Sequence, residues 1–313
     1  MNARRIAANE KNKISVENFD LPLPLPDEVL VETLYTAIST GTEVARIQNI
    51  TNPPTKFPYY PGYSACCRVI EKGREVKTIE VGQIVVCQTP HASHWVTKAE
   101  KCFLLPEGVS EVEGAVIRLG TISLRGVRKA DIKAGWNVAV VGLGPIGFLA
   151  ALLARYAGAA HIAGIDRQQW KCDLAKECGI NKVATSFEAA NLDGNIDVIL
   201  EATGNPETIP AVLRLAKKSG RVVLLGSHRG VTSQVDFYNT VHKKGLTIIG
   251  VHDSTRSNSL HTDVDAIFKL ILQRGLNLKP LIKDAIHYEE SEKTYEHLIN
   301  KTGNNLIAVL SWK

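Results

Sequence analysis

The stretch from residue 137 to residue 157 constrains the fold of this chain more than any other part of its 313 residues. An apolar run over 137–141 leads into a glycine-rich loop, which opens an apolar helical pattern over 146–157. In such a unit the first glycine permits the tight turn, the second lets a ligand approach the backbone, and the third lets helix and strand pack closely. Free N–H groups at the start of the helix, and its positive dipole end, favour phosphate. The pattern predicts a dinucleotide-binding loop formed by Gly142, Leu143, Gly144, Pro145, Ile146 and Gly147.

The alternation of strand and helix continues beyond this loop to about residue 274. We expect six strands, over residues 137–141, 161–165, 181–184, 197–202, 221–225 and 246–249. Helical patterns fill the gaps, over 146–157, 168–178, 206–218, 238–244 and 264–274. Most of the strands are near-continuous apolar runs, which indicates burial on both faces and hence parallel pairing. The fold class predicted for this part is α/β, with a Rossmann doubly wound parallel sheet.

Asp166 ends the second predicted strand, where a carboxylate would bind the hydroxyls of an adenosine ribose. A 2′-phosphate at that place would be repelled, so the sequence favours NAD(H) over NADP(H). Arg167, the next residue, leaves NADP(H) open. The alternative interpretation is purely structural: a glycine-rich turn beside a solvent-facing aspartate.

The chain before about residue 115 has a different pattern. Short β-rich runs over 28–35, 65–71 and 83–87 are separated by proline and glycine, as in half-buried antiparallel strands. After residue 280 come a helical pattern near 289–300 and a last strand over 306–312. We therefore expect a separate β-rich domain at the start of the chain.

The composition indicates which classes of partner this chain can bind. The net charge is +5, from 37 basic and 32 acidic residues, and no basic block is interleaved with aromatic residues. Nucleic acid is therefore a poor candidate, and an anionic small molecule fits better. The most apolar stretch, near 138–154, is broken by glycine and proline, so we expect no membrane span. Six dispersed cysteines without a Cys-x-x-Cys motif, and no signal-like core at the N-terminus, favour reduced thiols and a cytoplasmic protein.

Nearly the whole chain resembles the medium-chain dehydrogenase/reductase family. The resemblance rests on Ser39-Thr40-Gly41-Thr42-Glu43, Pro61-Gly62-Tyr63-Ser64, the segments 68–73, 81–83 and 105–110, the glycine-rich loop, and 197–204. It implies a GroES-like, β-rich catalytic domain over residues 1–115, completed by 280–313, and a dinucleotide-binding domain over 116–279. It also implies a homodimer joined through the sixth strands.

The chain departs from this family where zinc-dependent members bind their metal. Those members have a cysteine at the place of Thr40, Gly-His-Glu at the place of Gly62-Tyr63-Ser64, and often an acidic ligand near Arg118. Zinc requires thiolate, imidazole or carboxylate ligands, which this set does not supply. The four-cysteine structural zinc lobe is missing as well. We therefore expect no zinc, and the motifs are similar to a zinc-lacking branch that includes enzymes like the bacteriochlorophyllide hydroxyethyl dehydrogenase.

The same positions provide the candidate catalytic residues. Tyr63 could act as a general acid or base if a cation lowers its pKa from about 10, and Arg118 could be that cation or could anchor an anionic substrate. Thr40 and Thr42 could hydrogen-bond the substrate oxygen or line the cofactor site. Alanine at position 45, where some members have a relay histidine, removes the usual proton path. A hydrogen-bond donor worth roughly 2.7–4 kcal/mol could replace a good part of what zinc supplies.

Each of these residues also has a structural interpretation. Tyr63 could simply pack, and Arg118 could pair with a carboxylate such as Glu113. His91 is a candidate for the substrate pocket, although loop histidines are more often solvated, and His252 with Asp253 is a second such candidate.

By resemblance, the ends of the later strands extend the cofactor site to Ala202, Thr203, Leu225, Gly226 and Ser227. The function predicted is a zinc-independent, NAD(H)-dependent oxidoreductase that interconverts an alcohol and a ketone or aldehyde on a polar or cyclic metabolite. The alternatives are an NAD(P)H-dependent quinone or enone reductase, and a non-catalytic dinucleotide-binding protein.

Overall fold

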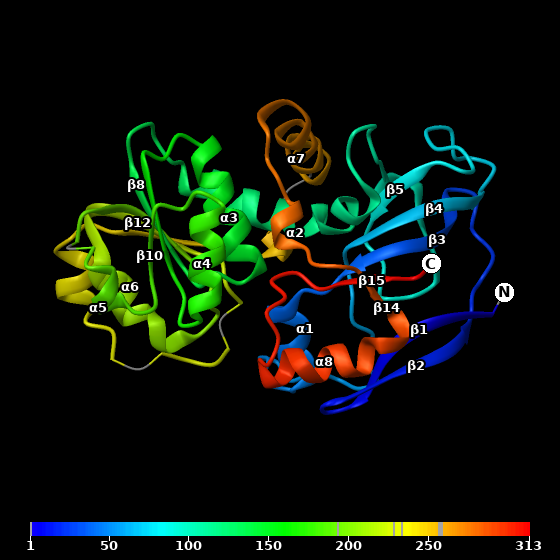
Figure 1. The fold of residues 1–313 in the computed structure, drawn as a ribbon, viewed down its shortest axis with the longest axis horizontal. Helices are drawn as coiled ribbons and strands as arrows, with labels where there is room; N and C mark the ends of the chain where they lie inside the picture. Colours follow the sequence, from blue (N-terminus) through cyan, green and yellow to red (C-terminus); the bar gives the residue numbers. More distant parts are fainter. Residues whose placement is uncertain (1, 193, 228, 233, 256–258) are drawn as a thin grey trace. The chain divides into compact units, whose positions relative to one another are not determined.

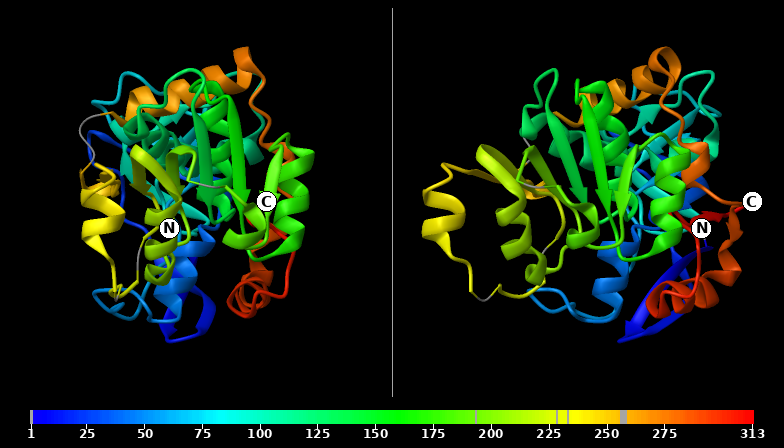
Figure 2. Two further views of the ribbon diagram at one scale, coloured as in Figure 1. Left: turned by 90° about the vertical axis from the view of Figure 1, so that its left-hand side faces the viewer. Right: turned by 60° about the vertical axis from the view of Figure 1, so that its left-hand side comes forward.

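The chain forms two units in this computed structural model, which describes residues 2–192, 194–227, 229–232, 234–255 and 259–313. Residues 1–119 and 264–313 make up the first unit, and residues 120–263 make up the second. Figures 1 and 2 show the elements of both. Residues 264–279 therefore lie in the first unit, whereas the sequence analysis assigned them to the dinucleotide-binding domain. The reason is packing, because Leu272 of this segment lies against the turn at Gly108.

The second unit contains the predicted parallel sheet. Within the described residues its strand order is β10-β9-β8-β11-β12-β13, and all neighbours are parallel. The strands are β8 (Asn137–Val141), β9 (His161–Ile165), β10 (Lys182–Ala184), β11 (Ile196–Glu201), β12 (Ala216–Leu224) and β13 (Thr247–Gly250). This is the order of a dinucleotide-binding doubly wound sheet, with the first strand at the point where the order reverses. The predicted fold class is confirmed.

Helices connect these strands. They are α3 (Pro145–Tyr156), α4 (Gln169–Glu177), α5 (Phe187–Ala190) and α6 (Ile209–Leu215), and Tyr238–His242 forms a π-helical turn. The apolar runs are buried as expected: all six residues of β11 are buried, as are four of the five in β8. The helix predicted over 206–218 ends earlier, because the backbone of Ala216 is already extended (φ −65°, ψ 136°) and starts β12.

The first unit is built on a mainly antiparallel sheet of order β14-β15-β3-β4-β5-β7, to which β6 adds by pairing with β3. Its strands are β3 (Glu28–Ala37), β4 (Ala65–Lys72), β5 (Ile84–Cys87), β6 (His94–Lys98), β7 (Phe103–Leu104), β14 (Ile286–His287) and β15 (Val309–Ser311). A separate hairpin pairs β1 (Asn2–Glu10) with β2 (Lys13–Asp20). The last strand of the chain, β15, pairs with β3, so the C-terminal segment completes the first unit.

Two helices of functional importance were not predicted. The first is α1 (Thr40–Ile47), and the second is α2 (Glu111–Ala130). Every residue of α2 from 115 to 121 is buried, including Arg118 and Thr121. Its start does carry a local signal, since Ser110 and Glu113 hydrogen-bond each other as a capping box. The remaining long helices are α7 (Leu260–Arg274) and α8 (Ser291–Asn300).

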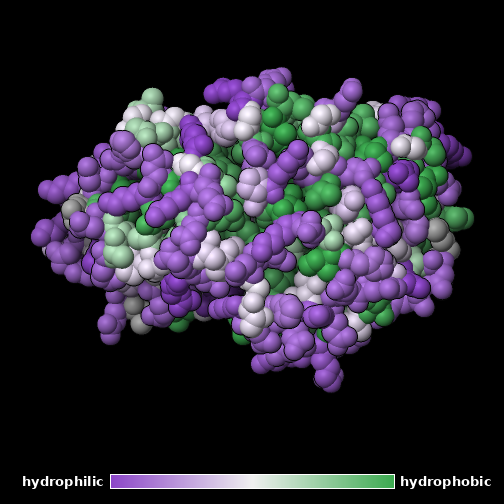
Figure 3. Space-filling view, viewed as in Figure 1, coloured by the Kyte–Doolittle hydropathy of each residue, from purple (hydrophilic) through white to green (hydrophobic). Residues whose placement is uncertain are grey.

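Hydrophilic side chains cover much of the face drawn in Figure 3, with apolar ones showing between them. Among the described residues, no helix combines the length and apolar character needed to span a membrane.

Candidate functional site

The glycine-rich loop of the second unit has the geometry of a phosphate cradle. Gly142 has φ +91°, in the left-handed region that favours glycine, and a Cβ there would meet the Thr203 backbone nitrogen at 2.9 Å. A Cβ at Gly147 would overlap the carbonyl oxygen of Gly142 and lie 2.9 Å from the Ala202 Cβ. Gly144 is different, because a Cβ there would meet nothing within 4 Å. Gly142 and Gly147 thus allow the close packing of the turn, and Gly144 leaves open space beside its backbone.

The helix that follows offers unsatisfied donors to this space. Gly144 is the N-cap of α3 and Pro145 its first residue, and no side chain caps the helix. The first backbone N–H groups of a helix have no partner within it, and the dipole makes this end attractive to anions. The residues therefore fit the pyrophosphate of a dinucleotide.

Asp166 lies directly beside the loop, at the end of β9. Its Oδ2 accepts a hydrogen bond from the backbone of Leu143 at 2.8 Å, and its Oδ1 accepts one from the backbone of Gln168 at 3.0 Å. Lys171 on α4 also approaches Oδ2, at 3.4 Å. Arg167 is exposed. The predicted pair of loop and carboxylate is thus brought together, and Lys171 is a cation that the sequence analysis missed.

The predicted strand-end residues also border the loop. A Cβ at Gly142 would touch Thr203, and one at Gly226 would lie 3.0 Å from the carbonyl carbon of Ala202. The buried Glu201 fixes this edge by accepting from the Thr203 backbone at 2.9 Å. Leu225 is buried and Ser227 is exposed. The carboxyl ends of β8, β11 and β12 therefore meet, as expected for ligand binding in a parallel sheet.

The segment after β13 is held by a residue that the sequence analysis did not single out. Arg125 donates to the His252 carbonyl at 2.8 Å and to the Thr255 hydroxyl at 2.7 Å. The imidazole of His252 is exposed and pairs with the Ser254 hydroxyl at 2.7 Å. Arg125 thus fixes the backbone while the ring of His252 faces solvent.

In the first unit, Tyr63 belongs to a cluster of hydroxyl groups. It donates to the Ser39 Oγ at 2.6 Å, and the Thr42 side chain also hydrogen-bonds it. Thr40, the first residue of α1, is half-buried. Gly62 has φ +104°, and its Cβ would lie 2.8 Å from the Pro90 carbonyl carbon, so this turn requires glycine.

The pKa of Tyr63 moves in the opposite direction to that proposed from the sequence. Burial, and to a lesser extent the charge of Glu43, raises it to about 12, while hydrogen bonds with Ser39 and Thr42 and the charge of Arg118 lower it only in part. The expectation that a cation brings this phenol towards neutrality is wrong for the structure as described, because desolvation outweighs the charge. Tyr63 is therefore a protonated phenol at neutral pH.

Arg118 lies on α2 and is buried. With the Gln88 amide oriented so that its oxygen faces the guanidinium, Gln88 accepts from Nε and, at 3.0 Å, from Nη2. Nothing in the sequence pointed to Gln88.

His91 is not a loop histidine in an open pocket. It is fully buried, and its Nε2 lies 2.9 Å from the Oε2 of Glu43. The Tyr295 hydroxyl donates to the same oxygen, and the Ser39 backbone donates to Oε1 at 2.8 Å. The expectation that His91 faces substrate is therefore corrected: a buried carboxylate requires donors, and His91 is one of them.

The residues at the family's zinc positions do not fit the metal. Tyr63 retains its proton, Arg118 is a cation, and Thr40 provides a neutral hydroxyl, whereas zinc requires thiolate, imidazole or carboxylate. Over the part of the chain that the structure describes, no three His, Cys, Asp or Glu side chains are grouped to hold a metal ion.

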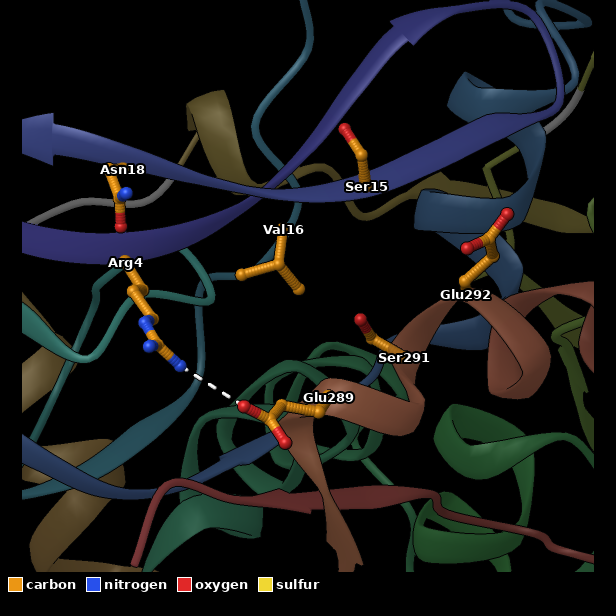
Figure 4. Close-up of a pocket in the computed structure, with 7 residues that line it drawn as sticks. All are labelled: Arg4, Ser15, Val16, Asn18, Glu289, Ser291 and Glu292. Carbon is orange, nitrogen blue, oxygen red and sulfur yellow. Dashed lines mark hydrogen bonds and ion pairs between the residues drawn. The ribbon is translucent and has the colours of Figure 1, made fainter.

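A further hollow, of about 440 Å³, lies in the first unit between the β1–β2 hairpin and the start of α8 (Figure 4). Arg4 and Glu289 form an ion pair at 3.1 Å on its wall. None of the predicted site residues lines it.

Comparisons with known proteins agree with the nucleotide-binding geometry. Residues 145–269 match the family described as zinc-binding dehydrogenase. The chain is 26% identical to an L-threonine 3-dehydrogenase of Protochlamydia amoebophila, over 95% of this chain and 96% of the relative. It superposes on galactitol-1-phosphate dehydrogenase from Escherichia coli with a TM-score of 0.87, at 22% identity, covering 98% of this chain and 99% of that one.

A protein from Sinorhizobium meliloti 1021, described as a zinc-binding dehydrogenase and solved with bound NADP, superposes with a TM-score of 0.85 at 23% identity, covering 99% of each chain. These proteins are named dehydrogenases, and the bound NADP of the last one agrees with the nicotinamide cofactor expected from the sequence. Over nearly its whole length, the chain is therefore similar to dehydrogenases.

Proposed function

We propose that this chain is a dehydrogenase that works without zinc, prefers NAD(H), and interconverts an alcohol and a ketone on a polar or cyclic metabolite. The observation that carries the proposal is the hydroxyl cluster of Ser39, Thr42 and Tyr63, because Tyr63 stands where the resemblance implies a zinc ligand and its phenol does not suit zinc. This chemistry agrees with the zinc-lacking branch that the sequence resembles.

A bound nicotinamide dinucleotide supplies the hydride in this chemistry. Gly142, Gly144, Gly147 and the start of α3 would hold its pyrophosphate, and Asp166 its adenosine ribose. Tyr63 would give a proton to the substrate oxygen. Because its pKa is about 12, Tyr63 holds that proton at neutral pH, which favours the direction of ketone reduction.

Arg118 contributes a fixed positive charge near the same phenol. A preorganised donor aimed at a developing negative oxygen is worth roughly 2.7–4 kcal/mol, so Tyr63 can supply much of what a metal would. A cation close by adds to that stabilisation when water is excluded.

Cofactor preference follows from the surroundings of Asp166. Its negative charge would repel a 2′-phosphate, which favours NAD(H). Arg167 and Lys171 beside it would weaken that repulsion, so NADP(H) is a weaker second ligand. A marked preference for NADPH would instead support the quinone or enone reductase.

We also propose that the chain is a homodimer joined at β13. This strand is the last of the sheet, and Ile248 on it is 40% exposed. An exposed apolar edge strand is a ready surface for pairing with a second copy.

The function is tested by NADH oxidation with acetoin and dihydroxyacetone, and by NAD⁺ reduction with L-threonine, 2,3-butanediol and galactitol 1-phosphate. The protein is first treated with EDTA and its metal content is measured. Tyr63→Phe and Arg118→Ala should slow turnover by on the order of 10²-fold or more. Tyr60→Phe is the matched control, since the Tyr60 hydroxyl accepts from Arg5 at 2.9 Å on the same loop and should be neutral. Loss of activity on zinc removal, or full activity of Tyr63→Phe, would overturn the proposal.

A further inference from the structure

Ser39 occupies an unusual position for a serine that begins a helix. It is the N-cap of α1, where a serine side chain ordinarily accepts from the backbone N–H of the second or third helical residue. Its side chain makes no such bond. Its Oγ instead accepts from the Tyr63 hydroxyl at 2.6 Å. The Ser39 hydroxyl therefore does not cap the helix and instead contacts the phenol of Tyr63.

The buried Glu43 compensates for this missing cap. Its side chain reaches back from the first turn of α1 and accepts from the Ser39 backbone N–H at 2.8 Å. His91 and Tyr295 donate to the other carboxylate oxygen. Glu43, His91 and Tyr295 are each 0% exposed. Donors from α1, from the segment after β5 and from α8 therefore hold one carboxylate, which fixes the backbone of Ser39.

Tyr295 acts as a hydrogen-bond donor in this cluster. Burial raises the pKa of Tyr295 well above its ordinary value, so Tyr295 keeps its proton and donates a hydrogen bond to Glu43. The His91 Nε2 faces the carboxylate, while its Nδ1 is buried with no hydrogen-bond partner within the described residues. A proton on Nε2 lets the ring donate to the carboxylate, and the absence of one on Nδ1 avoids burying an unpaired N–H.

We propose that Ser39 is a positioning residue for proton transfer by Tyr63, and that Glu43, held by His91 and Tyr295, sets the position of Ser39. The inference rests on the proposed role of Tyr63. When Tyr63 gives its proton to the substrate oxygen, its O–H first turns from the Ser39 Oγ to the substrate and then breaks, a new O–H bond forms on the substrate, and the electron pair stays on the Tyr63 oxygen. The Ser39 and Thr42 hydroxyls then rotate to donate to that oxygen.

Two features support this role. Ser39 is 3% exposed and bonded to the Tyr63 hydroxyl, so little water competes for its own hydroxyl. The hydrogen bonds of Ser39 and Thr42 both lower the pKa of Tyr63 against the effect of burial, which is the direction needed to stabilise the phenolate.

The contact is tested first without any substrate. Protein labelled with ¹³Cζ-tyrosine gives resonances for eight tyrosines, and the one that Tyr63→Phe removes is that of Tyr63. Ser39→Ala and Glu43→Gln should each move this resonance, and Ser39→Thr, which keeps the hydroxyl, should return it close to its original position. Thr33→Val removes a buried hydroxyl on β3 outside the cluster and should leave it unmoved. An unmoved resonance in Ser39→Ala would overturn the inference.

Kinetics then separate positioning from structure, with whichever of acetoin and dihydroxyacetone the wild type reduces faster. Ser39→Ala should lower kcat by roughly tenfold, the worth of one hydrogen bond, with KM changed less than about twofold, and Ser39→Thr should recover it. Because Glu43 acts through Ser39, the double variant that combines Ser39→Ala with Glu43→Gln should be no slower than Ser39→Ala alone. If Glu43→Gln does not fold, Tyr295→Phe takes its place.

The outcomes distinguish this inference from the function on which it rests. Full turnover by Tyr63→Phe would overturn the proposed function. A slow Tyr63→Phe with a fully active Ser39→Ala would overturn the positioning role alone. Fully additive losses in the double variant would show that Glu43 does not act through Ser39.

Discussion

Substituting alanine for two glycines of the same loop should separate cofactor binding from folding. At Gly147 an added Cβ overlaps the Gly142 carbonyl oxygen and lies 2.9 Å from the Ala202 Cβ, so backbone must shift. Overpacking of this kind costs about 1–3 kcal/mol. A loss of 1 kcal/mol lowers Tm by roughly 2–4 °C in a domain of this size, so Gly147→Ala should melt about 2–12 °C below wild type.

Gly144→Ala should have the opposite profile. A Cβ there meets nothing within 4 Å, and the backbone (φ −72°, ψ −179°) is one that alanine adopts freely. Tm should therefore stay the same or rise slightly, because alanine lowers the entropy of the unfolded chain. The new methyl would stand where the pyrophosphate approaches, and we expect the Kd for NADH to rise by at least about tenfold, or roughly 1.4 kcal/mol.

The two variants are compared by thermal unfolding and by titration of NADH fluorescence, with Gly303→Ala as control. Gly303 lies in the first unit, and a Cβ there also meets nothing within 4 Å. Wild-type NADH affinity in Gly144→Ala would refute the proposal that the pyrophosphate binds beside Gly144. A wild-type Tm in Gly147→Ala would refute the packing argument.

Three further predictions follow from single residues. Asp166→Ser should raise the Kd for NADH by roughly tenfold, because the carboxylate that would bind the adenosine ribose is gone. It should lower the Kd for NADPH, because that carboxylate would repel a 2′-phosphate. Both values come from the same fluorescence titration, and unchanged Kd values would contradict the role of Asp166. Tyr63 has a pKa of about 12 in the folded protein and about 10 in the unfolded chain, so its contribution to stability is complete below pH 10 and is lost as pH rises through 12. Chemical denaturation between these pH values should show that the wild type loses stability more steeply than Tyr63→Phe. Equal slopes would contradict the pKa shift. Ile248→Lys on β13 should shift a dimer to monomer in light scattering with the fold intact, and an unchanged mass would exclude this edge as the interface.

Much of the second unit could be predicted because its signals are local. Each parallel strand buries both faces, so the sequence shows a continuous apolar run, and all six predicted strands overlap strands of the sheet. The glycine-rich loop needs only neighbours in sequence to form its turn. The limits of α6 and β12 were wrong because extended backbone at Ala216 interrupts an otherwise helical pattern.

The first unit was harder to predict at the level of side chains. Helix α2, which carries Arg118, was not predicted, although its apolar residues recur with a helical period. Gln88 and Tyr295 carry no motif, and their importance comes only from the groups that they contact. A serine directly before a helix is a common N-cap, which could have drawn attention to Ser39. Helix α1 itself was not predicted, so this signal was missed.

By itself the sequence determined the dinucleotide loop and its carboxylate, because a strand, a turn and a helix that follow one another place Gly142, Gly147 and Asp166 together through local geometry. The tertiary structure alone decided the state of Tyr63 and the partners of Glu43. His91 is 48 residues from Glu43 in the chain and Tyr295 is 252 residues away, so only packing brings them to one carboxylate. Burial likewise decides the pKa of Tyr63, since desolvation depends on every atom that excludes water from the phenol, wherever it lies in the sequence.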